Sequence, residues 1–178
     1  MNINIKDSAL IRPLEERDLE ERVKWINDRD ISRTLMFDYP TSLAKTKAWF
    51  TSNLMNPTKQ HFTVARKTDD KAIGMTGLLD ISFKHRKAQA YITIGNPNFW
   101  NKGIGSKALR YTAKYGFNEL RLNRIYLYTL RSNTKARALY QKIGFKLEGI
   151  HKNSYFCNGD WHDLFVQAIF ADGFAEKA

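Results

Sequence analysis

Hydrophobic and polar residues follow two different spacings along this chain, and the first third carries the helical one. A short apolar piece at residues 9–11 leads through Pro13 into a charged segment, which predicts a helix from near Glu15 to Asp28. After a turn at residues 39–42, the next apolar residues share one helical face. This face predicts a second helix, and it consists of Leu43, Thr46, Trp49, Phe50 and Leu54.

The middle and the end of the chain carry the spacing of strands. Turn residues, such as Asp69-Asp70 and residues 84–87, separate the extended apolar runs. Asn158-Gly159 has the composition of a hairpin turn. Besides the first apolar piece, these patterns predict strands at residues 61–66, 72–83, 88–95, 124–130, 145–149 and 161–170.

Two more helices are predicted among these strands. Apolar residues repeat at helical spacing from Leu109 to Leu120. A shorter helix is capped by Ser132 or Asn133 and ends at Gly144. The order of elements predicts an α+β fold, with a central, mixed, mostly antiparallel sheet of about seven strands flanked by about four helices.

Length and composition fit one domain over residues 1–178. The chain is 43% apolar and 13% aromatic, which is typical of a globular protein with a substantial core. No apolar run reaches the roughly 20 residues that a bilayer span requires. The first seven residues have neither the basic start nor the apolar core of a signal peptide. A single cysteine, Cys157, excludes an internal disulfide and suits a reducing compartment, so we expect a cytoplasmic protein.

The chain is basic. Lys and Arg together number 29 against 18 Asp and Glu, which gives a formal net charge of +11. Such a surface attracts anions, among them nucleotides and the phosphates of coenzymes. The basic residues are scattered and no nucleic-acid-binding motif is present, so we expect neither a nucleic-acid partner nor a membrane partner.

A glycine-containing loop precedes the third predicted helix. Gly103 and Gly105 lie one residue apart, between Lys102 and Lys107. Glycine allows a tight turn and the close approach of a ligand to the backbone. The amides at the start of the following helix have no intrahelical partner. This segment therefore predicts a socket for a phosphate or pyrophosphate.

The loop alone leaves several interpretations open. Residues 103–108 match the Gly-x-Gly-x-x-(Gly/Ala) pattern of dinucleotide-binding folds. That pattern needs an acidic residue about 20 positions further on, and the next strand ends in Thr129-Leu130-Arg131 without one. A Walker A loop is excluded, because no Gly-Lys-Ser/Thr follows at the required spacing. A plain strand-to-helix turn without a ligand remains compatible with the loop.

A second segment distinguishes these interpretations. Residues 133–145 read Asn-Thr-Lys-Ala-Arg-Ala-Leu-Tyr-Gln-Lys-Ile-Gly-Phe. Together with the glycine loop, this segment resembles the GNAT acetyltransferase superfamily, whose patterns are (Q/R)-x-x-G-x-(G/A) and N-x-x-A-x-x-L-Y-x-x-x-G-F. Trp100 stands where that family usually has Gln or Arg. A tryptophan there resembles the branch of ribosomal-protein N-terminal acetyltransferases.

The resemblance implies an acyltransferase that uses acetyl-coenzyme A (acetyl-CoA) as cosubstrate. It implies that backbone amides near Ile94 and Gly95 polarise the thioester carbonyl. It also implies that Tyr140 is the general acid that protonates the leaving thiolate, while Asn133 either bonds the pantetheine arm or only caps a helix. Lys107 either adds charge or is an ordinary surface lysine. The residues implied to hold the pyrophosphate are Lys102, Gly103, Ile104, Gly105 and Ser106.

The general base is not evident from the sequence. Residues 88–94, where many relatives place a Glu, contain no carboxylate. We therefore expect deprotonation of the amine through water, with Asp80 as a helper, and regard His61 and His85 as ordinary strand or turn residues. The four histidines show no metal-ligand spacing, so no metal is expected. Cys157 has no activating neighbour, which favours direct transfer over an acetyl-cysteine intermediate.

The acceptor is expected to meet the first two helices and the loop between them. A nucleotide-linked amino sugar is one expected acceptor, since aromatic rings and arginines suit a flat phosphorylated ligand. A protein N-terminal amine ranks beside it, and a polyamine such as spermidine ranks third because of the net charge of +11. A non-catalytic CoA-binding module is the alternative from another class, and the apolar last strand suggests a homodimer. The predicted acceptor-binding residues are Arg29, Arg33, Tyr39 and Trp49.

Overall fold

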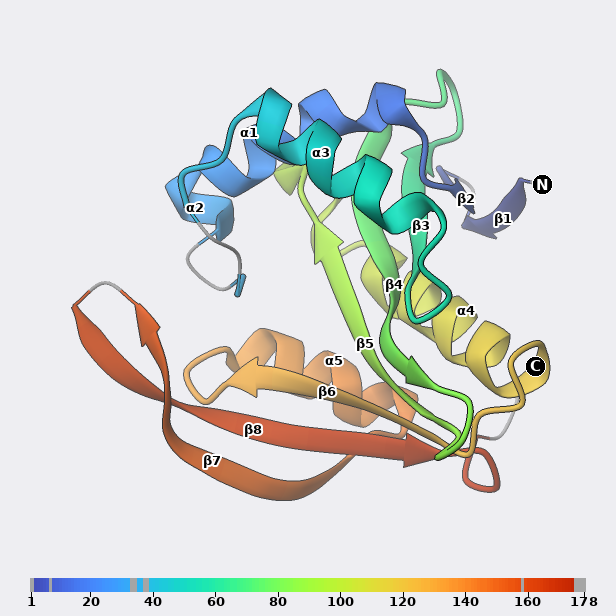
Figure 1. The fold of residues 1–178 in the computed structure, drawn as a ribbon, viewed down its shortest axis with the longest axis vertical. Coiled ribbons are helices and arrows are strands. Elements are labelled where there is room, and N and C mark those ends of the chain that lie inside the picture. Colours follow the sequence, from blue (N-terminus) through green and yellow to red (C-terminus); the bar gives the residue numbers. More distant parts are fainter. Residues whose placement is uncertain (1, 7, 33–34, 37–38, 158, 175–178) are drawn as a thin grey trace.

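The computed structural model describes residues 2–6, 8–32, 35–36, 39–157 and 159–174. Eight strands form one sheet in the order β1-β2-β3-β4-β5-β6-β8-β7 (Figure 1). The strands are β1 (Ile3–Lys6), β2 (Ala9–Pro13), β3 (Gln60–Arg66), β4 (Ala72–Ser82), β5 (Lys87–Ile94), β6 (Arg124–Leu130), β7 (Lys146–Cys157) and β8 (Asp160–Phe170). The helices of the same residues are α1 (Leu19–Asn27), α2 (Arg29–Ser32), α3 (Leu43–Leu54), α4 (Ile104–Asn118) and α5 (Thr134–Ile143), with 3-10 turns at Glu16–Asp18 and Pro97–Phe99.

The predicted α+β fold is confirmed, with one strand and one helix more than expected. The additional strand is β1, and the additional helix is the single turn α2. The predicted helix from near Glu15 is divided into a 3-10 turn and α1. None of the described helices is long and apolar enough to cross a membrane.

The sheet is antiparallel except where β5 meets β6. These two strands are parallel, and they pair only over Lys87–Gln89 against Arg124–Tyr126. Beyond this short register the strands separate, and Figure 1 shows β6 leaving the lower end of β5 at a wide angle. The separation divides the molecule into a part built on β1 to β5 and a part built on β6 to β8.

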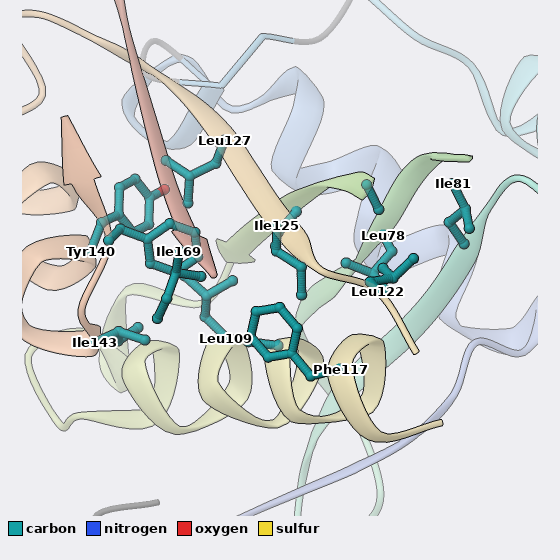
Figure 2. Close-up of a cluster of buried hydrophobic side chains, with 14 residues drawn as sticks. Leu78, Ile81, Leu109, Phe117, Leu122, Ile125, Leu127, Tyr140, Ile143 and Ile169 are labelled. Atoms are coloured by element: carbon teal, nitrogen blue, oxygen red, sulfur yellow. The ribbon is translucent and has the colours of Figure 1, made fainter. Parts of the chain in front are cut away.

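Helix α4 covers one face of the sheet next to this separation. Its apolar face packs into a cluster of buried side chains from β4, β6 and α5, which Figure 2 shows. Leu109, Ala113 and Phe117 are buried in this cluster, as the helical spacing predicted. Thr112 of the same helix shares a hydrogen bond of 2.8 Å with Thr76 of β4.

The first helices cover the opposite face. Trp25 of α1 packs against Met75 of β4, and Trp49 of α3 contacts the same cluster. Because Met75 neighbours Thr76 in a strand, their side chains point to opposite faces of the sheet. The sheet therefore lies between α4 on one side and the pair α1 and α3 on the other (Figure 1).

Three sequence predictions were wrong in detail. Only Thr46 is fully buried on the predicted face of α3, and Leu54 is 60% exposed because it stands at the end of the helix. The strand predicted at residues 145–149 continues to Cys157, because antiparallel pairing with β8 holds its mostly exposed residues. The last strand, β8, is an inner strand, so the sheet edge predicted there belongs to β7. Asn158 of the predicted hairpin turn lies outside the described residues.

A buried ion pair connects α1 to the sheet. Arg12 of β2 donates two hydrogen bonds of 2.7 and 2.8 Å to the carboxylate of Asp18, and the two side chains are 4% and 3% exposed. Thr63 of β3 donates a further hydrogen bond of 2.7 Å to Asp18. Burial alone would raise the pKa of Asp18, but the bonds from Arg12 and Thr63 outweigh it and lower this pKa. Arg12 also binds Asp70, in the turn between β3 and β4.

The substitution Asp18→Asn tests this connection. It leaves a buried guanidinium short of one carboxylate, and removing one partner of a buried pair costs about 3–5 kcal/mol of the free energy of unfolding. Since Asp70 still contacts Arg12, the lower end of that range is expected. Urea unfolding of both proteins measures the difference.

The matched control is Asp69→Asn, which removes the exposed ion pair between Asp69 and Arg66. This change is expected to leave the urea midpoint nearly unaltered, because exposed pairs contribute little. Equal shifts for the two variants would contradict the structural role given to Asp18.

Candidate active site

The start of α4 lies beside the end of β5 and offers free amides. Gly103 is the N-cap residue, with φ of 74°, and no side chain caps the helix. The first bond of this turn runs from the Lys107 amide to the Gly103 carbonyl, at 3.2 Å. The amides of Ile104, Gly105 and Ser106 therefore have no acceptor within the helix, and such a helix start binds phosphate groups.

Gly105 is not required by the packing of the protein. A Cβ built at this position would lie 3.5 Å from side-chain atoms of Ile94 and Leu139, which is ordinary van der Waals contact. Gly103, by contrast, has a left-handed backbone that favours glycine. A glycine at position 105 is therefore better explained by the close approach of a ligand to its backbone, and the predicted pyrophosphate site fits this segment.

The end of β5 presents a second free amide. Gly95 donates its amide to the Ile73 carbonyl at 2.9 Å, which makes Ile94 and Gly74 a pair without direct backbone bonds. The amide of Ile94 therefore points away from β4, toward the side from which β6 has separated. The indole of Trp100 donates to the carbonyl of Ile94 at 2.7 Å and so connects the phosphate loop to this strand.

This arrangement refines the predicted site. Because its own amide is already bonded, Gly95 does not offer a donor to a thioester carbonyl. Its small size serves packing instead, since a Cβ there would lie 2.0 Å from the ring of Trp25. For Ile94, whose amide points away from β4, the role at the thioester carbonyl remains a prediction. Trp100, which departs from the family pattern, has a defined place in the loop.

A cavity of about 460 Å³ connects the helices α1 and α3 to the separation of β5 and β6. It is lined by residues of β4 and β5 and also by two side chains from the other part of the molecule, Tyr128 of β6 and Tyr140 of α5. The cavity therefore spans the region between the first helices and the residue predicted to be the general acid.

Tyr140 lines this cavity and belongs to the cluster of Figure 2. Its side chain is 8% exposed, and burial raises its pKa to about 12. The phenol is therefore protonated at neutral pH. No hydrogen bond to its hydroxyl is present among the described residues. This is the state in which a phenol can donate a proton to a ligand.

One wall of the cavity combines aromatic rings with cationic groups. The guanidinium of Arg22 lies 4.1 Å from the ring centroid of Trp49, and the rings of Trp49 and His61 are 5.0 Å apart. The Nδ1 atom of His61 shares a hydrogen bond of 2.7 Å with the hydroxyl of Tyr91. Burial, then the charges of Arg22 and Lys59, lower the pKa of His61 to about 4. His61 is therefore neutral at pH 7.

The predicted acceptor residues are not all brought together. Trp49 and the predicted helper Asp80 line the cavity. Asp80 has φ of 50° and lies where the register of β4 against β5 shifts. Arg29 and Tyr39 instead contact each other, with the guanidinium 3.9 Å from the ring centroid, and neither lines the cavity. Arg33 lies outside the described residues.

Two more predicted residues have structural partners of their own. The side chain of Asn133 accepts a hydrogen bond of 3.1 Å from the Ala136 amide and so caps α5. A bond from Asn133 to pantetheine remains a prediction. Lys107 is exposed on the first turn of α4. His85 lies in the exposed turn after β4 and does not line the cavity.

Sequence reasoning missed Arg22 and Lys59 of the cavity wall. In the sequence, Arg22 belongs to a charged run that suggests a solvent-facing side. It stands three residues before Trp25 and four before Ile26, which are both buried. This spacing places Arg22 on the buried face of α1 and could have identified it. Lys59 precedes β3 without any pattern that would mark it.

The separated strand pair, the helix start with free amides and the buried tyrosine agree with the acetyltransferase that the sequence led us to expect. The sequence pattern of the family described as Acetyltransferase (GNAT) domain matches residues 9–146. The chain belongs to this family of acetyltransferases, whose acetyl donor is acetyl-CoA.

Individual proteins with similar sequences bear related names. A spermidine N(1)-acetyltransferase of Escherichia coli K12 is 28% identical over 163 residues, which cover 92% of this chain and 86% of the relative. A putative ribosomal N-acetyltransferase, YdaF of Bacillus subtilis, is 29% identical over 173 residues, covering 93% and 92%. The crystal structure of spermidine N-acetyltransferase from Vibrio cholerae in complex with CoA and spermine superposes with a TM-score of 0.88, at 26% identity, and covers 95% of this chain and 99% of that one.

Replacing Gly105 by Ala tests the phosphate socket. The methyl group fits the protein and lowers backbone entropy in the unfolded chain, so stability should rise by about 0.4–1 kcal/mol. Binding of coenzyme A should weaken by roughly tenfold or more, because the methyl group occupies space that the ligand needs. Calorimetric titration with coenzyme A and thermal unfolding measure the two effects.

Gly149→Ala is the matched control, since a Cβ at Gly149 meets no atom within 4 Å. It should leave coenzyme A affinity unchanged. If Gly105→Ala bound coenzyme A as tightly as this control does, the start of α4 would not be the phosphate site.

The low pKa of His61 predicts a pH dependence of stability. The unfolded chain takes up this proton near pH 6.5, whereas the folded chain does so only near pH 4. Between these values the unfolded state binds more protons, so stability falls as the pH falls, by at most about 1.4 kcal/mol per pH unit. Urea unfolding from pH 7 to pH 4 measures the slope.

In His61→Asn this part of the slope should disappear, while the exposed His85→Asn should keep it. Other groups titrate equally in all three proteins, so the difference between slopes is the informative quantity. A slope in His61→Asn equal to that of the unchanged protein would show that His61 does not resist protonation.

Proposed function

We propose that this protein transfers the acetyl group of acetyl-CoA directly to the primary amine of a small molecule bound in the cavity. The observation that carries the proposal is the course of the cavity, from Trp49 of α3 to Tyr140 of α5. An amine held among the first helices can thereby reach a thioester whose sulfur lies near Tyr140. Membership of the acetyltransferase family supports the reaction type.

Each step of the transfer has a candidate group. The nitrogen lone pair attacks the thioester carbonyl, and the amide of Ile94 is oriented to stabilise the negative charge that develops on the oxygen. The carbon–sulfur bond then breaks, and the Tyr140 phenol donates its proton to the sulfur. The attacking nitrogen loses one proton to water, and the Tyr140 phenolate takes up one proton from water in return, so the reaction balances. No covalent enzyme intermediate is required.

Deprotonation of the amine is assigned to water. Among the described residues that line the cavity, Asp80 is the one carboxylate, and we propose that it accepts the proton through an ordered water molecule. His61 is a weaker candidate, because its Nδ1 already shares a hydrogen bond with the hydroxyl of Tyr91.

Two classes of acceptor are supported by different observations. The names of the relatives favour a polyamine over the amino sugar or protein N-terminus expected from the sequence. The cavity wall favours an amine with an acidic group, since Arg22 and Lys59 face the same space as Trp49. Relationship therefore supports a polyamine as the acceptor, and the chemistry of the cavity supports an anionic amine.

The function is tested by following thiol release from acetyl-CoA with spermidine, a nucleotide-linked amino sugar and a Ser-initiated peptide. Amine-dependent thiol release with at least one of them supports the enzyme. Coenzyme A binding without any release would favour the non-catalytic module instead.

Tyr140→Phe tests the general acid. The substitution removes only a hydroxyl, which has no hydrogen bond among the described residues, so folding and coenzyme A affinity should change little. The turnover number should fall about 100-fold or more, as is typical when a general acid is lost. Steady-state kinetics with the best amine give the turnover number, and titration gives the affinity.

Tyr128→Phe is the control, because Tyr128 lines the same cavity from β6 without a predicted role in proton transfer. It should retain most of the turnover. A turnover number of Tyr140→Phe close to that of this control would remove Tyr140 from the mechanism.

A further inference from the structure

Among the described residues that line the cavity, cationic side chains outnumber acidic ones. The charged residues of the described chain that line it are Arg22, Lys45, Lys59 and Asp80. Two of these cations, Arg22 and Lys59, lie close enough to His61 that their charges lower its pKa. The wall around His61 is therefore electropositive.

Lys59 is the informative residue of this wall. It is half-buried and precedes β3, so its backbone is held at the start of a strand of the sheet. Its ammonium group makes no ion pair with any described residue, and Asp80 of the same cavity does not pair with it. A partly buried ammonium without a carboxylate is poorly compensated unless a ligand supplies the negative charge.

Arg22 contributes a fixed surface beside it. Its guanidinium lies against the ring of Trp49, and the ring of Trp49 contacts that of His61. A planar guanidinium held against an aromatic ring can bind a carboxylate or a phosphate through two parallel hydrogen bonds. The same wall repels a ligand that carries several ammonium groups.

We infer that the acceptor amine carries an anionic group, a carboxylate or a phosphate, which Lys59 and the Arg22–Trp49 surface bind while the amine is directed toward Tyr140. This inference rests on the proposed function and names the class of acceptor for the same cavity. The inferred acceptor therefore differs from the polyamines after which some relatives are named.

Matched pairs of amines test the inference. Glucosamine 6-phosphate is compared with glucosamine, serine with serinamide, and spermidine is measured beside them. For at least one pair, the anionic member should have a kcat/KM about tenfold above its uncharged partner, and above that of spermidine. The pair that shows the preference distinguishes phosphate from carboxylate.

Substitutions at Lys59 test whether this residue causes the preference for anionic amines. Lys59→Gln should reduce the preference about tenfold, through KM with little change in kcat, because the group binds the acceptor and does not react. Lys59→Arg should keep the preference, which guards against a mere loss of structure. Lys59→Glu should improve spermidine relative to the anionic amines. Lys146→Gln, on the exposed strand β7, is the matched control and should change nothing.

Ligand binding provides a readout without catalysis. Because Trp49 lines the cavity, an anionic amine that binds there should change the tryptophan fluorescence, and Lys59→Gln should weaken this response. Binding of this kind without turnover would support the anionic site and overturn the proposed transfer reaction. Turnover of spermidine that exceeds all other amines and does not depend on Lys59 would overturn the inference and leave the enzyme. Neither binding nor turnover with any amine would overturn both.

Discussion

The separation of β5 and β6 is the constraint on which the candidate site depends. After the short pairing that ends at Gln89 and Tyr126, the inner edge of β5 faces no neighbouring strand. Backbone groups in the middle of a sheet must find partners, and the chain supplies only some of them. Trp100 bonds the carbonyl of Ile94, whereas the amide of Ile94 is left facing the space. The start of α4 and Tyr140 lie at the same separation, so one break in the sheet orients amides and a buried phenol toward one ligand.

The other half of the site depends on how α1 is fixed over the sheet. The pair between Arg12 and Asp18 is buried, and such a pair is costly to form unless its geometry is good. Here it joins β2, β3 and the residue before α1, and Asp70 adds the turn after β3. The wall that carries Arg22 is part of α1, so the position of the proposed acceptor surface depends on an interaction at the start of this helix, one turn before Arg22.

Periodicity in the sequence was sufficient to predict the elements that surround the donor site. The apolar face of α4, the strand β6 and the cap and end of α5 at Asn133 and Gly144 all agree with the structure, because local spacing and local caps determine them. The strand β1 is too short for its alternation to be significant, and β7 is held by pairing with β8 and not by apolar residues. The acceptor cavity could not be predicted, since it depends on which segments meet. Arg29 and Tyr39 have the right chemistry but contact each other, whereas Arg22 belongs to a charged run and lies on the buried face.

Family membership and the cavity wall determine different parts of the function. The reaction type follows from membership of the family, and we assign its steps to the amide of Ile94, the start of α4 and Tyr140. The acceptor depends on side chains of α1, α3 and the start of β3, and one fold supports different acceptors when such side chains change. At 28% identity, most residues of this chain differ from those of the spermidine enzyme. The name of that relative is therefore better evidence for the type of reaction than for the substrate. An ammonium group at Lys59 and a guanidinium against Trp49 are poor partners for a polycation. We therefore infer the class of acceptor from the charge of the wall, whereas membership of the family shows the chemistry performed on it.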